Sequence, residues 1–257
     1  MNSPKDEAAL VNNEAVVSQS PQKQGKSASD WLRETQFYIF GIVYMFARIS
    51  INTTATMLPL YLTVAVRCPK KEDHETALAI AAVPLSQYLA SAIFSVTLQT
   101  KINETFGNRL IPMALSIIVT TAGSIPMALL SWDSLQTWMY ILAPMQGIGN
   151  ALMLNTSTAI ISDVIGNDNT SAAFVYGAYS LADKFANGVL LFYLVSAYAD
   201  EIEPLALIMA IVPTVSAIAC TFATWLGYRL YADKLAKMSV SKKRKSRSSS
   251  IELASAS

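Results

Sequence analysis

Apolar residues in this chain gather in six long runs that are separated by short polar segments. The runs cover residues 36–66, 76–98, 110–132, 137–162, 171–198 and 204–231. A helix that crosses a bilayer needs about 20 consecutive, mainly apolar residues, and it satisfies its backbone hydrogen bonds internally. The pattern therefore predicts an all-α, multi-pass membrane protein with six transmembrane helices.

The two ends of the chain are polar and show no apolar period. Residues 1–35 are rich in Ser, Asn, Gln and Lys, and residues 232–257 contain the basic run SKKRKSRSSS. Segments of this composition cannot bury enough apolar surface to fold by themselves. We therefore expect a disordered segment at 1–35, a six-helix transmembrane domain at 36–231 and a disordered basic tail at 232–257.

Composition narrows the class of protein further. Hydrophobic side chains make up 53% of the 257 residues and charged side chains only 14%, whereas a typical soluble domain carries about 25% charged residues. Two cysteines and one histidine supply neither a disulfide framework nor a metal-ligand motif, so we expect no metal and no cofactor. The spans hold no Ser/His or paired-Asp constellation, and the net charge is only +1, which disfavours an enzyme and a nucleic-acid-binding protein.

Lysine and arginine residues outside the apolar runs predict the orientation in the membrane. If the N-terminus is cytoplasmic, that side holds Arg109 and most of the basic residues, and the other side holds only Arg67, Lys70 and Lys71. The positive-inside rule then places both termini in the cytoplasm. Arg109 and Asp163 would meet on that side, either as a cytoplasmic gate or as two solvated charges without a partner.

Three ionisable residues, Arg48, Asp183 and Lys184, interrupt the apolar runs. A charge near the bilayer centre costs about 2.5–3.5 kcal/mol on insertion scales, so each one needs a partner or a function. Tyr44, Arg48 and Asn52 recur at four-residue intervals, which places them on one face of the first predicted helix. This face should therefore line a cavity or a helix contact.

The fifth predicted helix carries a second polar face. The candidate solute-binding residues on all the helices are Tyr44, Arg48, Asn52, Asn150, Ser180, Asp183, Lys184 and Asn187. One interpretation is structural: Asp183 neutralises Arg48 or Lys184 in a buried pair that binds no ligand. The other is functional: the charges bind a small polar or zwitterionic solute, with a proton or sodium ion as the candidate coupling ion.

Two stretches of the sequence carry a resemblance to a known family. WLRETQFYIFGIVYMFARISINTTATMLPLYLT resembles the seventh helix, and DVIGNDNTSAAFVYGAYSLADKFANG the tenth-to-eleventh helix junction, of the major facilitator superfamily domain-containing protein 12 family. That family is similar to the glycoside-pentoside-hexuronide cation symporters, in which a lysine on the eleventh helix faces the central cavity, and Lys184 matches that position. The resemblance implies the C-terminal half, a 3+3 inverted repeat, of a twelve-helix transporter.

The resemblance also implies a function. It indicates secondary active transport of a small polar solute by alternating access, with cysteine import into lysosomes and related organelles such as melanosomes as the family's activity. A cation-coupled symporter of sugars or other small solutes is one alternative, and a non-transporting scaffold or regulatory partner of a full-length carrier is another. The expected partners are the lipid bilayer and an N-terminal six-helix half or a second copy. The expected location is a lysosomal or other endomembrane, with the plasma membrane as the alternative.

Overall fold

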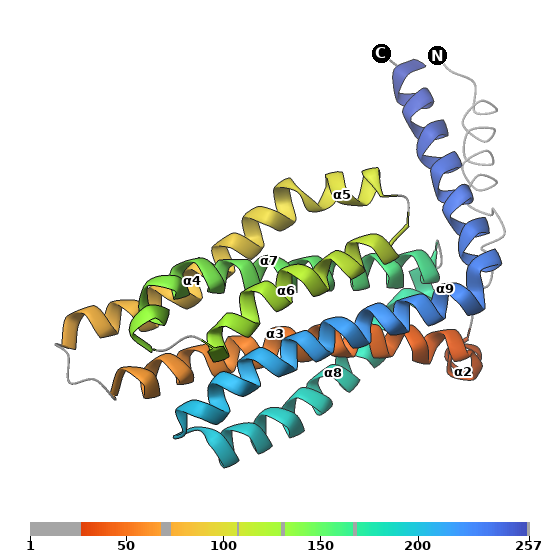
Figure 1. Cartoon of the computed structure of the whole chain (residues 1–257). Coiled ribbons are helices and arrows are strands. Elements are labelled where there is room, and N and C mark those ends of the chain that lie inside the picture. The colour runs from red at the N-terminus through yellow and green to blue at the C-terminus, as the bar shows by residue number, and fades with distance from the viewer. Residues whose placement is uncertain (1–26, 68–72, 107, 130–131, 167–168, 256–257) are drawn as a thin grey trace, which may run out of the picture.

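The computed structural model describes residues 27–67, 73–106, 108–129, 132–166 and 169–255, and all regular secondary structure among them is helical. The helices are α2 (Ala28–Arg33), α3 (Thr35–Arg67), α4 (Asp73–Thr97), α5 (Gln99–Thr105), α6 (Leu110–Leu129), α7 (Trp132–Ile165), α8 (Asn169–Tyr198) and α9 (Ile202–Ser255). The long helices form one bundle, and the C-terminal part of α9 bends away from it beside α2 (Figure 1).

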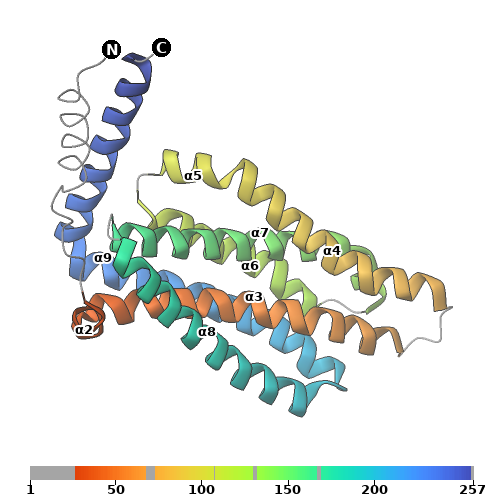
Figure 2. The same cartoon turned by 180° about the vertical axis from the view of Figure 1, so that it is seen from behind.

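Helix α3 is the centre of this bundle. It packs most extensively against α9 and also contacts α8, α7 and α4, while α6 lies between α7 and α9. Helix α8 lies on the opposite side of α3 from α4, and α3 is the helix it contacts most (Figure 2). The outer side of α8 therefore remains uncovered, and Leu181, Phe185 and Phe192 are each more than 70% exposed there.

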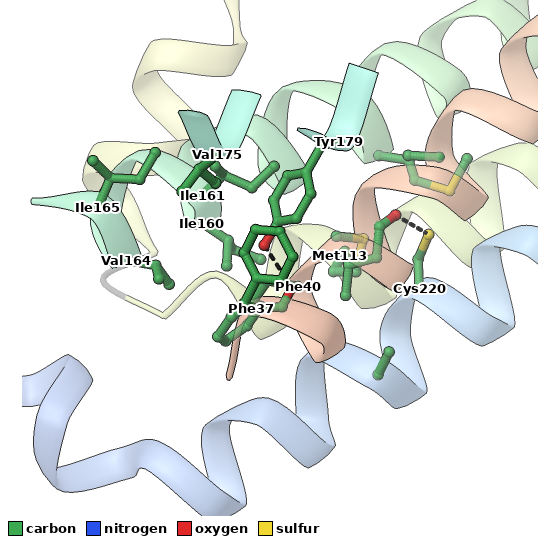
Figure 3. Packing of buried hydrophobic residues seen from close by; sticks show 14 of the residues in the cluster. Phe37, Phe40, Met113, Ile160, Ile161, Val164, Ile165, Val175, Tyr179 and Cys220 are labelled. Carbon is green, nitrogen blue, oxygen red and sulfur yellow. Dashed lines mark hydrogen bonds between the residues drawn. The ribbon is translucent and has the colours of Figure 1, made fainter. Parts of the chain in front are cut away.

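Two apolar clusters hold the bundle together at its two ends. The first, drawn in Figure 3, includes Phe37, Phe40, Met113, Ile160 and Tyr179. Within it, the Tyr179 hydroxyl donates a hydrogen bond of 2.6 Å to the carbonyl of Phe37, and this bond joins α8 to α3. The second cluster packs side chains of α3, α4, α6, α7, α8 and α9, and its fully buried members include Met57, Leu58, Met127, Met139, Leu205 and Met209.

Buried polar side chains lie between these two clusters along every long helix that contributes to both. On α3 they fall between Ala47 and Met57, and on α7 between Ala143 and Met153. The layer contains the buried residues Ser50, Thr53, Thr54, Ser116, Thr120, Ser124, Gln146, Asn150, Asp183, Asn187 and Ser216. We call it the polar layer. The predicted site residues Asn150, Asp183 and Asn187 belong to it, and Arg48 and Asn52 lie at the same level of α3, between Ala47 and Met57.

Membrane-spanning character is clearest in three of the helices. Leu78–Thr97 in α4, Leu110–Leu129 in α6 and Ile202–Tyr231 in α9 are long and apolar enough to cross a membrane by length and composition. The six-span prediction is thus supported directly for three helices of the described chain. Helices α3, α7 and α8 have 30 or more residues each, but they carry the charged and amide side chains of the polar layer.

The ends of the chain differ from the prediction where the structure describes them. Residues 28–33 form α2 and not a disordered segment, because Asp30 accepts a hydrogen bond of 3.1 Å from the backbone N–H of Ser27 and Trp31 is buried. The backbone of α9 is helical as far as Ser255, with a break at Tyr231 (φ −127°, ψ 21°), where a disordered tail was expected. Neither Gly nor Pro occurs after residue 227, so nothing in the sequence interrupts a helix there. The expected disorder at 1–26 lies outside the described residues.

Candidate functional site

A charged contact between α3 and α8 lies in the polar layer. Arg48 Nε donates to Asp183 Oδ2 at 3.1 Å, and the two side chains are 30% and 3% exposed. Asn187, one turn further along α8, donates from Nδ2 to Asp183 Oδ1 at 2.6 Å and to the Asp183 carbonyl at 2.9 Å. Each carboxylate oxygen of Asp183 therefore has its own donor, as a buried charge requires.

This geometry decides which of the predicted partners Asp183 has. The pair with Arg48 is confirmed, and the alternative pair with Lys184 is wrong. Lys184 is exposed, and the described part of the chain places no carboxylate within 4.0 Å of it. Neighbouring residues on a helix point about 100° apart, so Asp183 faces α3 while Lys184 points outward.

The outer face of α8 that carries Lys184 combines two glycines with the large exposed side chains of Leu181, Phe185 and Phe192. Gly177 and Gly188 lie on it, and a Cβ atom added to either would meet no heavy atom within 4 Å among the described residues. Tyr44, Asn52 and Ser180 are half-buried, and the Tyr44 ring stacks on Tyr179 with centroids 6.2 Å apart. The described part of the chain therefore leaves the outer face of α8 uncovered.

Asn150, the remaining predicted site residue, lies on a different side of α3. Its Oδ1 accepts a hydrogen bond of 2.7 Å from Ser50 Oγ, and its Nδ2 donates one of 3.0 Å to Thr54 Oγ1. All three side chains are buried. Asn150 thus joins α7 to α3 through neutral hydrogen bonds and is not part of the charged contact.

A second neutral chain of hydrogen bonds crosses the bundle at two glutamines. Gln87 Nε2 on α4 donates to Gln146 Oε1 on α7 at 3.3 Å. Gln146 Nε2 donates in turn to Ser124 Oγ on α6 at 2.9 Å and to the carbonyl of Met209 on α9 at 3.4 Å. Pro213 is four residues after Met209 and has no N–H, so the Met209 carbonyl lacks its helical partner and Gln146 replaces it.

A cavity of about 280 Å³ opens between α3, α4 and α7 beside these networks. Its polar lining consists of Thr54, Gln87, Tyr88, Ser91, Ser95, Asn150 and Asn155. Asn155 Nδ2 donates to Ser95 Oγ at 2.8 Å across the cavity wall. The prediction included only Asn150 from this set. The four-residue spacing of Gln87, Ser91 and Ser95 in the second apolar run was the signal that was missed.

Arg109 and Asp163, the predicted gate residues, do meet. Arg109 Nε lies 3.2 Å from Asp163 Oδ2, with side-chain exposures of 20% and 27%. The bond joins the start of α6 to the last turn of α7, at the end of the bundle that contains Phe37 and Tyr179. Of the two alternatives, the pair is confirmed and the unpaired charges are wrong, while a gating role stays a prediction.

Comparisons with known proteins place this arrangement in a family. The chain is similar to major facilitator superfamily domain-containing protein 12 of the mouse and of humans, with 38% identity over 160 residues in each case, which is 62% of this chain and 31% of the relative. The horse protein of the same name is 35% identical over 174 residues, 67% of this chain and 34% of the relative. This chain therefore spans about a third of the length of these curated relatives.

No solved structure matches the chain. The family model described as Major Facilitator Superfamily matches residues 40–254, which include every long helix of the bundle and all of the polar layer. The chain therefore belongs to the Major Facilitator Superfamily.

Proposed function

We propose that α3, α4, α6, α7, α8 and α9 are the six spans of one half of a secondary transporter, with both termini in the cytoplasm. This half would move a small polar solute by alternating access, together with a second six-helix half or a second copy. Membership of a transporter superfamily supports the class of function. The observation that carries the site is the Arg48–Asp183 contact, a charge pair held in the polar layer of an otherwise apolar bundle.

The two members of this pair differ in what they can still bind. Asp183 is buried, and both of its oxygens accept hydrogen bonds within the chain. Arg48 has five N–H donors, uses Nε toward Asp183 and keeps 30% of its side-chain surface exposed. A solute carboxylate can therefore bind the exposed edge of the guanidinium in a bidentate manner while Asp183 holds the group in place.

Cysteine is the solute that we propose to test first, in a lysosomal or related membrane. It carries a carboxylate for Arg48, and its import is the activity that the family resemblance implies. Lys184 and the exposed apolar residues of α8 would face the covering half, where Lys184 could add charge balance. A proton or sodium ion remains the candidate coupling ion.

The test is uptake of labelled cysteine into vesicles from cells that express the chain, alone or together with a full-length homologue. We expect Arg48→Gln to lower uptake that depends on the chain at least tenfold, because it removes the charge for the carboxylate. The matched control is Thr158→Val, since Thr158 Oγ1 bonds only a carbonyl of its own helix in the described structure. Unchanged uptake with Arg48→Gln would overturn the assignment of the site.

The uncovered face of α8 also favours a second function, a non-transporting partner of a full-length carrier. Gly177 and Gly188 on this face allow close approach of another helix, whatever that helix belongs to. This alternative predicts that the chain co-purifies with the full-length homologue and adds no uptake of its own. The same vesicles measure both quantities, so the two proposals can be distinguished in one experiment.

A further inference from the structure

The part of α9 that follows the break at Tyr231 leaves the apolar bundle and continues as a helix. Its backbone is helical over residues 232–255, which corresponds to about 36 Å at 1.5 Å per residue. We call this segment the α9 extension. It holds seven of the 19 Lys and Arg residues of the chain and only two acidic residues, and the proposed transport function uses none of them.

The residues before the break indicate where α9 leaves the membrane. The part of α9 that is long and apolar enough to cross a bilayer ends at Tyr231. Within the two preceding turns, the Trp225 ring is 41% exposed and stacks on Phe222 with centroids 5.9 Å apart. The Arg229 guanidinium lies 5.3 Å from the Trp225 centroid. Trp rings and long cationic side chains gather at the interface between membrane and water, so the break lies close to the bilayer surface.

The α9 extension runs across the direction of the long helices, and its far end projects clear of the bundle in both views (Figures 1 and 2). Because the long helices cross the membrane in the proposed topology, a helix that runs across them at the end of the bundle follows the membrane surface. The densest basic run, residues 242–247, begins eleven residues after Tyr231, or about 16 Å along the helix. This direction keeps the run beside the lipid around the bundle, and the attraction between charges extends over about 8 Å at physiological salt.

The composition of the basic run fits a diffuse negative surface. It carries five positive charges within six residues, at Lys242, Lys243, Arg244, Lys245 and Arg247. Successive positions of a helix are about 100° apart, so these five positions are distributed around the whole axis and not along one face. Residues 241–250 include no apolar residue, so this part has no apolar face to insert between lipid tails. A contact with one groove of a protein partner would need one face, whereas a charged surface needs only the number of charges.

We propose that the α9 extension docks on the cytoplasmic leaflet of the membrane and that residues 242–247 bind the headgroups of anionic lipids there. This inference goes beyond transport, and it rests on one part of the proposed function, the cytoplasmic placement of the C-terminus. Anionic lipids such as phosphatidylserine are concentrated in that leaflet, and each Lys or Arg held close to it strengthens attachment about fivefold.

The test uses the purified full-length chain in lipid nanodiscs of two compositions. One contains phosphatidylcholine alone, and in the other a third of this lipid is replaced by phosphatidylserine. A fluorophore is attached at Ser246→Cys in a Cys68→Ser background, and Cys220 stays unlabelled because it is fully buried in the folded chain. Both discs contain the same share of phosphatidylcholine with a spin-labelled headgroup, so quenching of the fluorophore reports how closely residue 246 approaches the membrane surface.

We expect at least twofold stronger quenching in the discs that contain phosphatidylserine, and this difference should disappear at high salt, which screens the charges. A neutral variant should show no difference between the two compositions; it combines Lys242→Gln, Lys243→Gln, Arg244→Gln, Lys245→Gln and Arg247→Gln. The matched control exchanges Lys for Arg and Arg for Lys at the same five positions. It keeps every charge and should therefore keep the full difference.

Three results would overturn the proposal. The first is equal quenching in the two compositions, and the second is a difference that salt does not reduce. The third is loss of the difference in the control that exchanges Lys and Arg, because a partner that distinguishes these side chains is a specific protein or nucleic acid and not a charged surface.

The sidedness of the contact is tested apart from its chemistry. In intact organelles that contain the chain, a membrane-impermeant thiol reagent should label the Ser246→Cys variant, and protection from it would overturn docking on the cytoplasmic leaflet. Quenching needs no solute and no second half of a transporter. It can therefore fail while uptake of cysteine persists, and uptake can fail while the quenching difference remains, so the two proposals fail separately.

Discussion

The charged contact of α8 with α3 and the hydrogen bonds that the α7 amides make with neighbouring helices both satisfy polar groups inside the bundle. We call the second set the neutral network, because none of its side chains carries a charge. Both place polar groups in the layer between two apolar clusters. In the charged contact, Asp183 is satisfied by Arg48 and Asn187, while the arginine stays 30% exposed. In the neutral network, Asn150 is buried and is bonded through both its oxygen and its nitrogen.

The difference separates a contact that can bind from one that mainly holds helices together. A guanidinium with unused donors on an open side can bind a ligand, whereas the Asn150 amide is buried and its oxygen and nitrogen each already bond a side chain of α3. The neutral network is also the better covered of the two, because α7 packs against α3, α4, α6 and α9, and α8 packs mainly against α3. Loss of stability and loss of binding should therefore follow different substitutions.

The largest effect should come from breaking the charged contact on the arginine side. Arg48→Leu leaves the Asp183 carboxylate buried without its cation, which should destabilise the chain by about 3–5 kcal/mol. Asp183→Asn should cost less than half as much, because the remaining arginine is partly solvated. Cys220 is buried, so its reaction with a thiol reagent during heating, in a Cys68→Ser background, reports unfolding and measures both losses. A larger loss in Asp183→Asn than in Arg48→Leu would contradict this account.

The next largest effect should come from the amide of the neutral network. Asn150→Leu removes the acceptor of the Ser50 hydroxyl and the donor to Thr54 Oγ1, and it should cost about 1–3 kcal/mol in the free energy of unfolding. Thr158→Val on the same helix serves as the control and should change it by less than about 0.5 kcal/mol. Equal losses in the two variants would show that the inter-helix hydrogen bonds contribute nothing net.

The link from Gln146 to the proline of α9 should give a smaller, coupled effect. Gln146→Leu leaves the Met209 carbonyl unpaired, whereas Pro213→Ala restores the N–H that this carbonyl lacks. We expect Pro213→Ala to stabilise the Gln146→Leu variant by about 1 kcal/mol more than it stabilises the natural chain. A double-mutant cycle in thermal unfolding measures this difference, and strictly additive effects would argue against the link.

The Arg109–Asp163 pair should contribute still less to stability. Both side chains are partly exposed, so Arg109→Ala and Asp163→Asn should each cost about 1 kcal/mol or less, and the cost should shrink at high salt. If the pair is also a gate, these variants should change the rate of cysteine uptake more than they change the melting temperature. Equal changes in both quantities would favour a purely structural pair.

The smallest effect should be that of Lys184→Ala. This side chain is exposed and has no carboxylate near it in the described chain, so the free energy of unfolding should change by less than about 0.5 kcal/mol. A lysine that meets the covering half would instead show its role only in uptake or in co-purification with a full-length homologue. A large loss of stability would place Lys184 in the charged contact after all.

Much of this organisation could be predicted from helix period and apolar run length. The run that becomes α6 begins at Leu110 in both the prediction and the structure, and the stripe through Arg48 does face a polar partner. The stripe of Gln87, Ser91 and Ser95 was missed because a neutral polar residue costs much less free energy in a membrane helix than a charge does, so the sequence pattern does not require a partner for it. Its meaning appears only when α4 and α7 are packed together.

The sequence by itself determined that this chain is a helical membrane protein and that ionisable residues interrupt its apolar runs at Arg48, Asp183 and Lys184. These properties depend on local composition and on a period of 3.6 residues, which any helix expresses wherever it packs. Only the tertiary structure decided that Asp183 pairs with Arg48, that Lys184 points outward and that Gln146 bonds the Met209 carbonyl, which Pro213 leaves without a helical donor. Each of these depends on which helix faces meet, and that choice is made by the packing of the whole bundle.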